Sequence, residues 1–311
     1  MAGHINLSAS RPPPKRSTSR AARIPFLSMP TLPPIVLTFA ASDPTGGAGL
    51  QADLLTLASM GCHPLSVVTG ITVQDTRGVD DLLAMDSDWV VDQARKLLED
   101  MPVAAFKLGV LGSIENITVI AEIISDYPEV PVILDPVLAS GRGDALAGDD
   151  MIVALRELIV PQTTVLTPNS MEARRLGQED EEGEEPALDE CASRLIELGC
   201  EFVLITGTHE NTPDVVNILY GGDGIVRTDR WKRLPRSFHG SGCTLASAIA
   251  ATMANGLDVP EAVREAQEYT WQALAHGFRP GMGQHLPDRF FWAREVEGEG
   301  ASRSSNPSED S

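Results

Sequence analysis

The sequence predicts an α/β protein, a three-layer α/β/α sandwich around a mostly parallel central sheet. Short runs rich in β-branched residues alternate with stretches whose apolar residues recur every third or fourth position. This alternation is typical of βαβ units, which build a parallel sheet covered by helices on both faces. The length of 311 residues allows two domains. We nevertheless expect one domain over residues 34–290, with a loose segment at each end.

The first two thirds of the chain contain the predicted parallel strands and the helices that connect them. The strands are expected at Ile35–Ala40, Pro64–Thr72, Val132–Pro136, Thr164–Thr167 and Phe202–Thr206. The helices are expected at Leu50–Met60, Asp88–Glu99, Glu115–Ser125, Asp150–Ile159 and Leu188–Leu198.

The last third of the chain has a different pattern. Val215–Thr228 is broken by a glycine-rich tetrapeptide and predicts an antiparallel hairpin. A helix of small residues is expected at Thr244–Ala254, and Asp258 with Glu261 forms a capping box for the helix that follows. These two helices are expected to close the body of the domain.

The net charge limits the kinds of partner. The chain has 24 Lys and Arg against 44 Asp and Glu, a net charge of −20. Such a protein would bind nucleic acid or anionic lipid against its own field, and no apolar run reaches the roughly 18 residues of a membrane span. We therefore expect no nucleic acid partner and no membrane association.

The two ends of the chain and one internal run look unstructured. Residues 1–33 carry five basic residues and no acidic one among Ser, Ala and Pro. This leader has some features of a transit peptide, and Met29 is an alternative start of translation. Residues 291–311, rich in Glu, Gly and Ser, are expected to form a disordered acidic tail, and residues 179–185 a solvated acidic loop.

The cysteines indicate a reducing compartment. The chain has 4 of them, without a CxxC pair, which is too few for a disulfide scaffold and unlike a zinc site. We expect a cytoplasmic protein, and any metal should be a hard cation that accompanies a substrate.

Ligands of parallel sheets bind beyond the carboxyl ends of the strands, and the first unusual loop there is Ala41–Gly49. Its glycines would let the backbone approach a small ligand closely. The loop fits neither the dinucleotide pattern GxGxxG nor the P-loop pattern GxxxxGK[ST]. A tight turn before a helix is the alternative interpretation.

The second loop, Phe238–Thr244, leads directly into a helix. Unpaired N–H groups at Gly240, Ser241 and Gly242, together with the helix dipole, would hold phosphate or developing negative charge. The same dipole should favour the thiolate of Cys243. The alternative is that Cys243 is an ordinary small buried residue.

Polar residues after two further strands suggest a cation site. Asp135, Asn169 and Glu172 should lie near the same edge of the sheet and could hold Mg²⁺ directly or through water. The alternatives are that Asn169 or Ser170 caps the helix that follows, and that Asp135, which precedes a proline, favours a turn.

Taken together, these loops resemble the ribokinase-like superfamily and, within it, the hydroxymethylpyrimidine/phosphomethylpyrimidine kinases of thiamine biosynthesis. The resemblance covers about Pro34 to Gly283. Its most specific segments are Ser42-Asp43-Pro44-Thr45-Gly46-Gly47-Ala48-Gly49-Leu50-Gln51-Ala52-Asp53, Val73-Gln74-Asp75-Thr76-Arg77-Gly78 and His239-Gly240-Ser241-Gly242-Cys243-Thr244.

The resemblance implies phosphorylation of 4-amino-5-hydroxymethyl-2-methylpyrimidine, and then of its monophosphate, with ATP and Mg²⁺. It assigns Gln74 to pyrimidine recognition and Cys243 to removal of the hydroxyl proton. The other implied substrate positions are Asp53, Ala41 and Thr72. The implied phosphate and nucleotide positions are Asn169, Thr206, Gly207 and Gly242, and the implied metal positions are Asp135 and Glu172. Relatives of this kind are commonly homodimers.

One position departs from the family pattern. Where many relatives have a lysine that neutralises the transferring phosphate, this chain has Thr206. Lys107 is one candidate for the missing cation; alternatively, Mg²⁺ and the backbone amides suffice. Two other functions stay open: a pyridoxal or pyridoxine kinase, and a pyrimidine-binding sensor without catalysis.

Overall fold

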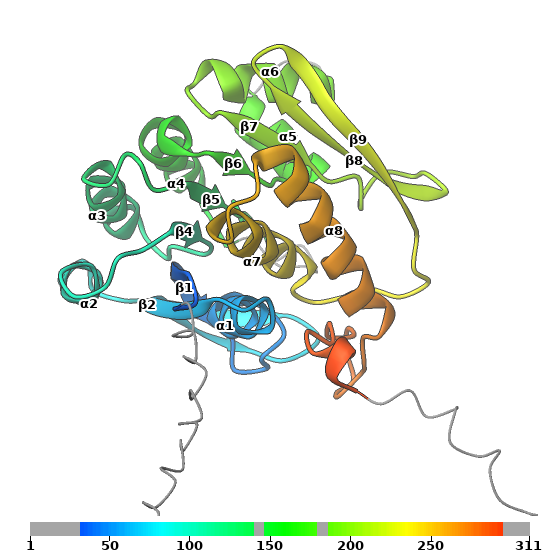
Figure 1. The fold of residues 1–311 in the computed structure, drawn as a ribbon, viewed down its shortest axis with the longest axis horizontal. Helices are drawn as coiled ribbons and strands as arrows, with labels where there is room; N and C mark the ends of the chain where they lie inside the picture. The colour runs from blue at the N-terminus through cyan, green and yellow to red at the C-terminus, as the bar shows by residue number, and fades with distance from the viewer. Residues whose placement is uncertain (1–31, 140–145, 179–185, 295–311) are drawn as a thin grey trace, which may run out of the picture. The chain divides into compact units, whose positions relative to one another are not determined.

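The computed structural model describes residues 32–139, 146–178 and 186–294. From Pro33 onward the described residues form one compact unit. Its centre is a nine-stranded sheet in the order β3-β2-β1-β4-β5-β6-β7-β8-β9 (Figure 1). The strands from β2 to β7 in this order pair in parallel. At the edges, β3 pairs antiparallel with β2, β8 with β7, and β9 with β8.

The inner strands are short and apolar because both of their faces are covered. In β1, for example, Val36, Leu37 and Phe39 are all completely buried. The strand bounds are β1 Ile35–Ser42, β2 His63–Gln74, β3 Val79–Ala84, β4 Ala105–Leu108, β5 Val132–Leu134, β6 Val165–Leu166, β7 Phe202–Ile205, β8 Asp214–Gly221 and β9 Gly224–Lys232.

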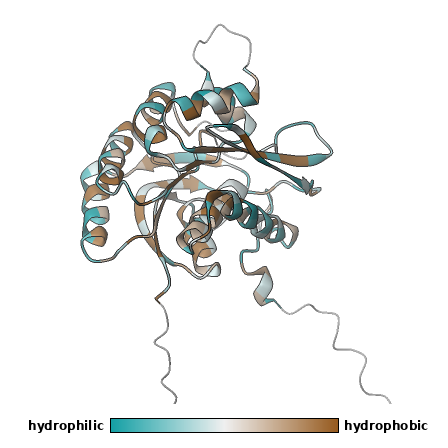
Figure 2. Cartoon of the chain, turned by 45° about the horizontal axis from the view of Figure 1, so that its top comes forward, coloured by the Kyte–Doolittle hydropathy of each residue, from teal (hydrophilic) through white to brown (hydrophobic). Residues whose placement is uncertain are grey.

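Helices cover the two faces with separate hydrophobic cores. The larger core lies under α2, α3, α4, α5 and α6, and the smaller one under α1, α7 and α8. Hydrophobic colouring is concentrated on the strands between the two helix layers (Figure 2). The helix bounds are α1 Gly49–Ser59, α2 Ser87–Leu98, α3 Ile114–Ser125, α4 Asp149–Ala154, α5 Ser170–Gly177, α6 Leu188–Glu197, α7 Ser241–Ala254 and α8 Val259–Ala275.

The predicted three-layer α/β/α fold is confirmed, including the late antiparallel hairpin. Two strands, β3 and β4, were not predicted, and α5 was expected only as the helix that Asn169 could cap. The predicted helix Asp150–Ile159 is α-helical only to Ala154 and continues as a π turn, Leu155–Ile159. A short 3-10 helix, Val160–Gln162, follows it.

The predicted end segments lie mostly outside the described residues. The basic leader to residue 31, the acidic loop 179–185 and the tail from residue 295 are in that category. The tail boundary at residue 291 was wrong, because Phe291–Ala293 forms a 3-10 turn and the Trp292 indole donates to Ser59 Oγ at 2.9 Å. No helix within the described ranges is both long and apolar enough to cross a membrane.

Candidate active site

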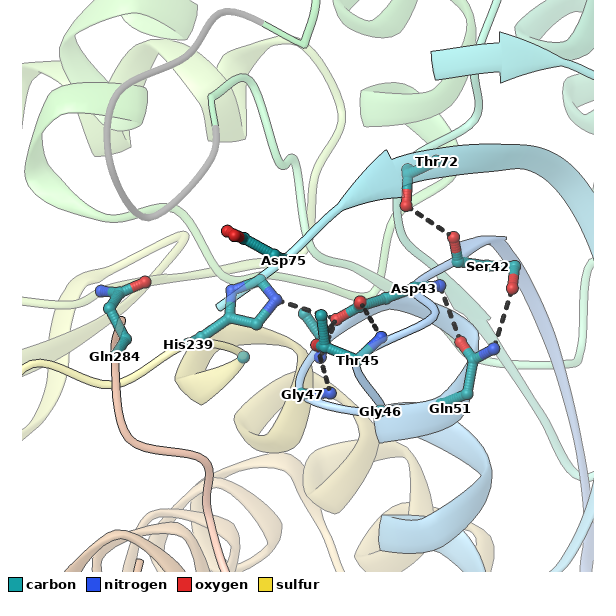
Figure 3. A network of polar contacts seen from close by, with 12 residues as sticks. Ser42, Asp43, Thr45, Gly46, Gly47, Gln51, Thr72, Asp75, His239 and Gln284 are labelled. Carbon is teal, nitrogen blue, oxygen red and sulfur yellow. Dashed lines mark hydrogen bonds and ion pairs between the residues drawn. The ribbon is translucent and has the colours of Figure 1, made fainter. Parts of the chain in front are cut away.

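The loop after β1 is organised around the carboxylate of Asp43. Its Oδ1 accepts from the Thr45 amide at 2.8 Å, and its Oδ2 accepts from the Thr45 hydroxyl at 3.0 Å and the Ala48 amide at 2.7 Å (Figure 3). Gln51 reaches back from α1 and accepts from the Asp43 amide at 2.8 Å. Burial alone would raise the pKa of Asp43, but hydrogen bonds from His239 and the loop amides outweigh it and lower this pKa.

The loop before α7 packs directly on this first loop. His239 Nε2 lies 2.8 Å from Asp43 Oδ2 and is the visible link in Figure 3. Gly240 adopts φ +83°, and a Cβ there would lie only 1.8 Å from the carbonyl oxygen of Gly47. A Cβ on Gly47 would lie 2.5 Å from His239 Cδ2. Both glycines are therefore required for the two loops to touch.

The N-terminus of α7 forms the candidate anion hole. Gly240 has no side chain, and no side-chain cap bond is present there among the described residues, so N–H groups of the first turn are available to water or a ligand. Asp135, just after β5, lies beside this turn: a Cβ on Gly242 would be 3.5 Å from its Oδ1. The structure thus places the Asp135 carboxylate beside Gly242 at the start of α7.

Cys243 is buried in the same turn. The Gly49 amide and the Asp135 carboxylate both lie near its thiol. Burial raises the pKa of Cys243, the negative charge of Asp135 raises it further, and Lys107 opposes them only in part. The prediction of a favoured thiolate was therefore wrong for the ligand-free protein, because desolvation outweighs the helix terminus.

The predicted cation ligands lie where strands β5 and β6 end. Asp135 is 4% exposed, and its Oδ2 has no hydrogen-bond partner within the part of the chain that is described. Burial raises the pKa of Asp135, although the charge of Lys107 opposes this. Burial and the charge of Asp135 together raise the pKa of Glu172 to about 8. Two neighbouring carboxyl groups, one with a free oxygen, fit a single hard cation.

The capping alternative is confirmed for Asn169, which forms a capping box with Glu172 at the start of α5. Glu172 accepts from the Asn169 amide at 3.0 Å and from the Leu138 amide at 3.3 Å. Because these contacts occupy Glu172, a cation at Asp135 would reach it through water. No group of three or more His, Cys, Asp or Glu suited to a metal occurs among the described residues.

The predicted nucleotide positions meet at the end of β7. Thr206 bridges to Asn169 and donates its amide to the Pro168 carbonyl at 3.0 Å. The Gly207 amide donates to Asn217 Oδ1 at 3.1 Å. Arg233, which sequence reasoning missed, holds the following loop through the carbonyls of Gly207, Thr208, Glu210 and Thr212.

The predicted pyrimidine positions lie on strands β1 and β2. Ala41 pairs in the sheet with Gly70, and the Thr72 hydroxyl donates to the Ser42 carbonyl at 2.9 Å (Figure 3). Gln74 ends β2 half-buried, and its side-chain amide makes no hydrogen bond within the described segments. That amide is therefore available to a ligand.

Two predicted roles need correction. Asp53 is fully buried and accepts from Thr38 at 2.9 Å and from Ser247 at 2.7 Å, so no side of its carboxylate faces a substrate. Lys107 is also fully buried, with Nζ 2.9 Å from both Asp53 oxygens. Burial alone would lower the pKa of Lys107, but Asp53 outweighs it and raises this pKa. Lys107 is thus neutralised inside the core and does not replace the lysine missing at Thr206.

Comparison with known proteins identifies the family. Residues 43–288 match the phosphomethylpyrimidine kinase family. The chain is 39% identical over 260 residues to a hydroxymethylpyrimidine/phosphomethylpyrimidine kinase of Streptomyces coelicolor, covering 82% of this chain and 93% of the relative.

Solved structures show the same fold. A phosphomethylpyrimidine kinase of Clostridium difficile has a TM-score of 0.66 and 32% identity, covering 78% of this chain and 99% of the other. A pyridoxal kinase of Staphylococcus aureus, solved with AMP-PCP and pyridoxal, has a TM-score of 0.74 and 26% identity, covering 84% of this chain and 96% of the other. Structural similarity thus ranks the pyridoxal kinase higher, and sequence identity ranks the pyrimidine kinases higher.

Proposed function

The chain belongs to the phosphomethylpyrimidine kinase family, and from this premise we propose that it transfers the terminal phosphoryl group of ATP to 4-amino-5-hydroxymethyl-2-methylpyrimidine and then to its monophosphate. The observation that carries the proposal is the first turn of α7. There, uncapped N–H groups, the thiol of Cys243 and the free oxygen of Asp135 come together. Phosphoryl transfer needs such a site, because its catalysis is mostly positioning and charge stabilisation.

Each residue has a distinct part in the proposed reaction. The free amide of Gln74 offers one acceptor and two donors, which suits an exocyclic amine beside a ring nitrogen. The backbones at Ala41 and Thr72 border the ring. Cys243 takes the proton of the attacking hydroxyl in its thiolate form, which requires that the raised pKa of this thiol falls when the substrates bind. The amides of Gly240, Ser241 and Gly242 stabilise the transferring phosphoryl group.

The nucleotide is held at the neighbouring strand ends. Asn169, Thr206 and Gly207 border its phosphates. Asp135 would hold Mg²⁺ directly and Glu172 through water, and the ion would neutralise phosphate charge when bound. The unpartnered Asp135 oxygen supports this assignment.

A pyridoxal kinase is the second candidate, because the solved pyridoxal kinase has the higher TM-score. Sequence identity and the segment Gln74-Asp75-Thr76 favour the pyrimidine. A sensor without catalysis is the third candidate, and the missing lysine at Thr206 motivates it. We further propose a cytoplasmic homodimer; light scattering would measure its mass, and a monomer would refute that part.

The test is phosphorylation of separate acceptors by the purified chain with ATP and Mg²⁺. Hydroxymethylpyrimidine, its monophosphate and pyridoxal are each supplied alone, and the products are identified by mass spectrometry. Consumption of both pyrimidines supports the proposal. Turnover of pyridoxal alone favours the second candidate, and binding without turnover favours the sensor.

A further inference from the structure

Arg289 is a buried cation without an acidic partner. It follows α8 in the C-terminal segment and is 4% exposed. The three nearby carboxylates have other partners: Asp43 contacts His239, Asp53 pairs with Lys107, and Asp288 pairs with Arg294. Among the described residues, no carboxylate forms an ion pair with Arg289. Burying a charge of this kind costs free energy unless a negative group nearby interacts with it.

The guanidinium of Arg289 joins the two glycine loops of the site. Nη1 donates to the Gly46 carbonyl at 3.3 Å, and Nη2 donates to the Gly47 carbonyl at 2.6 Å. On the other side, Nε and Nη2 donate to the Thr244 hydroxyl at 3.2 and 3.0 Å. That hydroxyl donates to the Gly240 carbonyl at 2.7 Å. Arg289 therefore links the loop after β1 to Thr244 in α7 and, through the Thr244 hydroxyl, to Gly240.

The backbone of Arg289 is also fixed. Its carbonyl accepts from Ser59 Oγ of α1 at 2.5 Å and from the Tyr269 hydroxyl of α8 at 2.8 Å. Helices α1 and α8 thus anchor the residue whose side chain holds the loops. A rigid fork of donors suits this role, because a guanidinium binds several acceptors in one plane.

We propose that Arg289 is a positioning residue for phosphoryl transfer, which holds the 43–49 loop against the first turn of α7 and adds a fixed positive charge behind the anion hole. This charge would offset the one that Thr206 cannot carry. This position explains why the guanidinium is buried without a carboxylate partner. Its negative partner is the transferring phosphoryl group, which binds at Gly242, two residues before Thr244. The inference rests on the proposed function.

The experiment compares Arg289→Met with Arg289→Lys. Lysine keeps the charge but loses the fork, and methionine loses both. We expect Arg289→Met to lower kcat by about 100-fold, the usual effect of losing one stabilising donor, with KM for the pyrimidine changed by less than about threefold. Arg289→Lys should recover about a tenth of the wild-type kcat. Arg294→Met is the matched control, because Arg294 lies in the same segment but its side chain is 66% exposed.

A second readout separates positioning from mere stability. The complex of Mg-ADP with aluminium fluoride and the pyrimidine mimics the transition state. Arg289→Met should weaken this complex by about 100-fold while the affinity for Mg-ADP alone changes by less than about threefold. The proposal would be overturned if Arg289→Met kept the kcat of the wild type at temperatures below its own melting temperature. It would also be overturned if the substitution weakened the binding of both complexes equally.

Other outcomes are also informative. If Arg289→Met does not fold, Thr244→Val removes the shared hydroxyl and keeps the charge; an unchanged kcat in Thr244→Val and Arg289→Lys then refutes the inference.

If the wild-type chain phosphorylates pyridoxal instead, the proposed function fails and the same kcat ratios are measured with pyridoxal. If it phosphorylates nothing, faster amide exchange at residues 43–49 in Arg289→Lys supports the positioning role and unchanged exchange refutes it.

Discussion

The contact between the two glycine loops makes Gly240 the most sensitive backbone position of the site. In Gly240→Ala, the new Cβ would start 1.8 Å from the Gly47 carbonyl oxygen, whereas real Cβ contacts stay beyond 3.0 Å. The loops must therefore separate by about 1.2 Å. A displacement of about 1 Å in a positioned site can reduce the rate 100-fold. We expect kcat to fall by at least that factor.

Gly256→Ala is the matched control for this substitution. Gly256 follows the other end of α7 with φ +96°, and nothing lies within 4 Å of a Cβ built there. Both substitutions place alanine in the left-handed region and cost about 1–2 kcal/mol of stability for that reason. Only Gly240→Ala adds the collision. The assay is steady-state kcat together with thermal melting of both variants. A kcat for Gly240→Ala within about threefold of that of Gly256→Ala would refute the packing argument.

Four further predictions follow from the same site. Cys243→Ala should lower kcat by about 10²–10⁴-fold, the range of general base catalysis; near-normal turnover in a steady-state assay would leave the cysteine a purely structural role. Asp135→Asn should raise the Mg²⁺ concentration for half-maximal activity by about tenfold or more, measured by magnesium titration, and an unchanged requirement would remove Asp135 as a ligand. Gln74→Leu should raise KM for the pyrimidine by about 10-fold or more with a smaller change in kcat; equal effects on both constants would contradict a recognition role. Because the pKa of Asp43 lies below its ordinary 3.8, the unfolded chain binds more protons than the native one near that pH. The stabilisation by Asp43 is thus complete above about pH 5 and lost as the pH falls through its native pKa; acid titration of Asp43→Asn should show a shallower loss, and a profile like that of the wild type would contradict it.

The parallel sheet could be predicted from the sequence because its strands alternate with amphipathic helices, but strands without that pattern were missed. In β4 the apolar run is interrupted by Lys107, which is buried only because Asp53, 54 residues away, neutralises it. Strand β3 contains Asp80 and Asp81, both exposed at the edge of the sheet. Local composition therefore misses strands whose polar residues depend on distant partners or on solvent.

In the candidate site, too, features set by short segments could be predicted from the sequence, whereas features set by distant residues could not. The glycine loops and Asp135 could be located because strand ends and glycine patterns are properties of short segments. The protonation of Cys243 could not, since it depends on burial between α1 and α7 and on the charge of Asp135. Arg289 was missed for the same reason: its partner Gly47 lies 242 residues earlier in the chain.

A net charge of −20 repels the anionic ATP that we propose as the phosphoryl donor. Binding of its phosphates must therefore depend on groups within the site. Lys107 is paired with Asp53 in the core, and Thr206 is neutral, so we propose that the attraction comes from the amides of the first turn of α7, the guanidinium of Arg289 and Mg²⁺ held at Asp135. Because Arg289 and Asp135 are buried, salt screens their charges much less than exposed ones. KM for ATP should therefore change little between low and physiological ionic strength, and a steep salt dependence would indicate that exposed lysines or arginines hold the nucleotide instead.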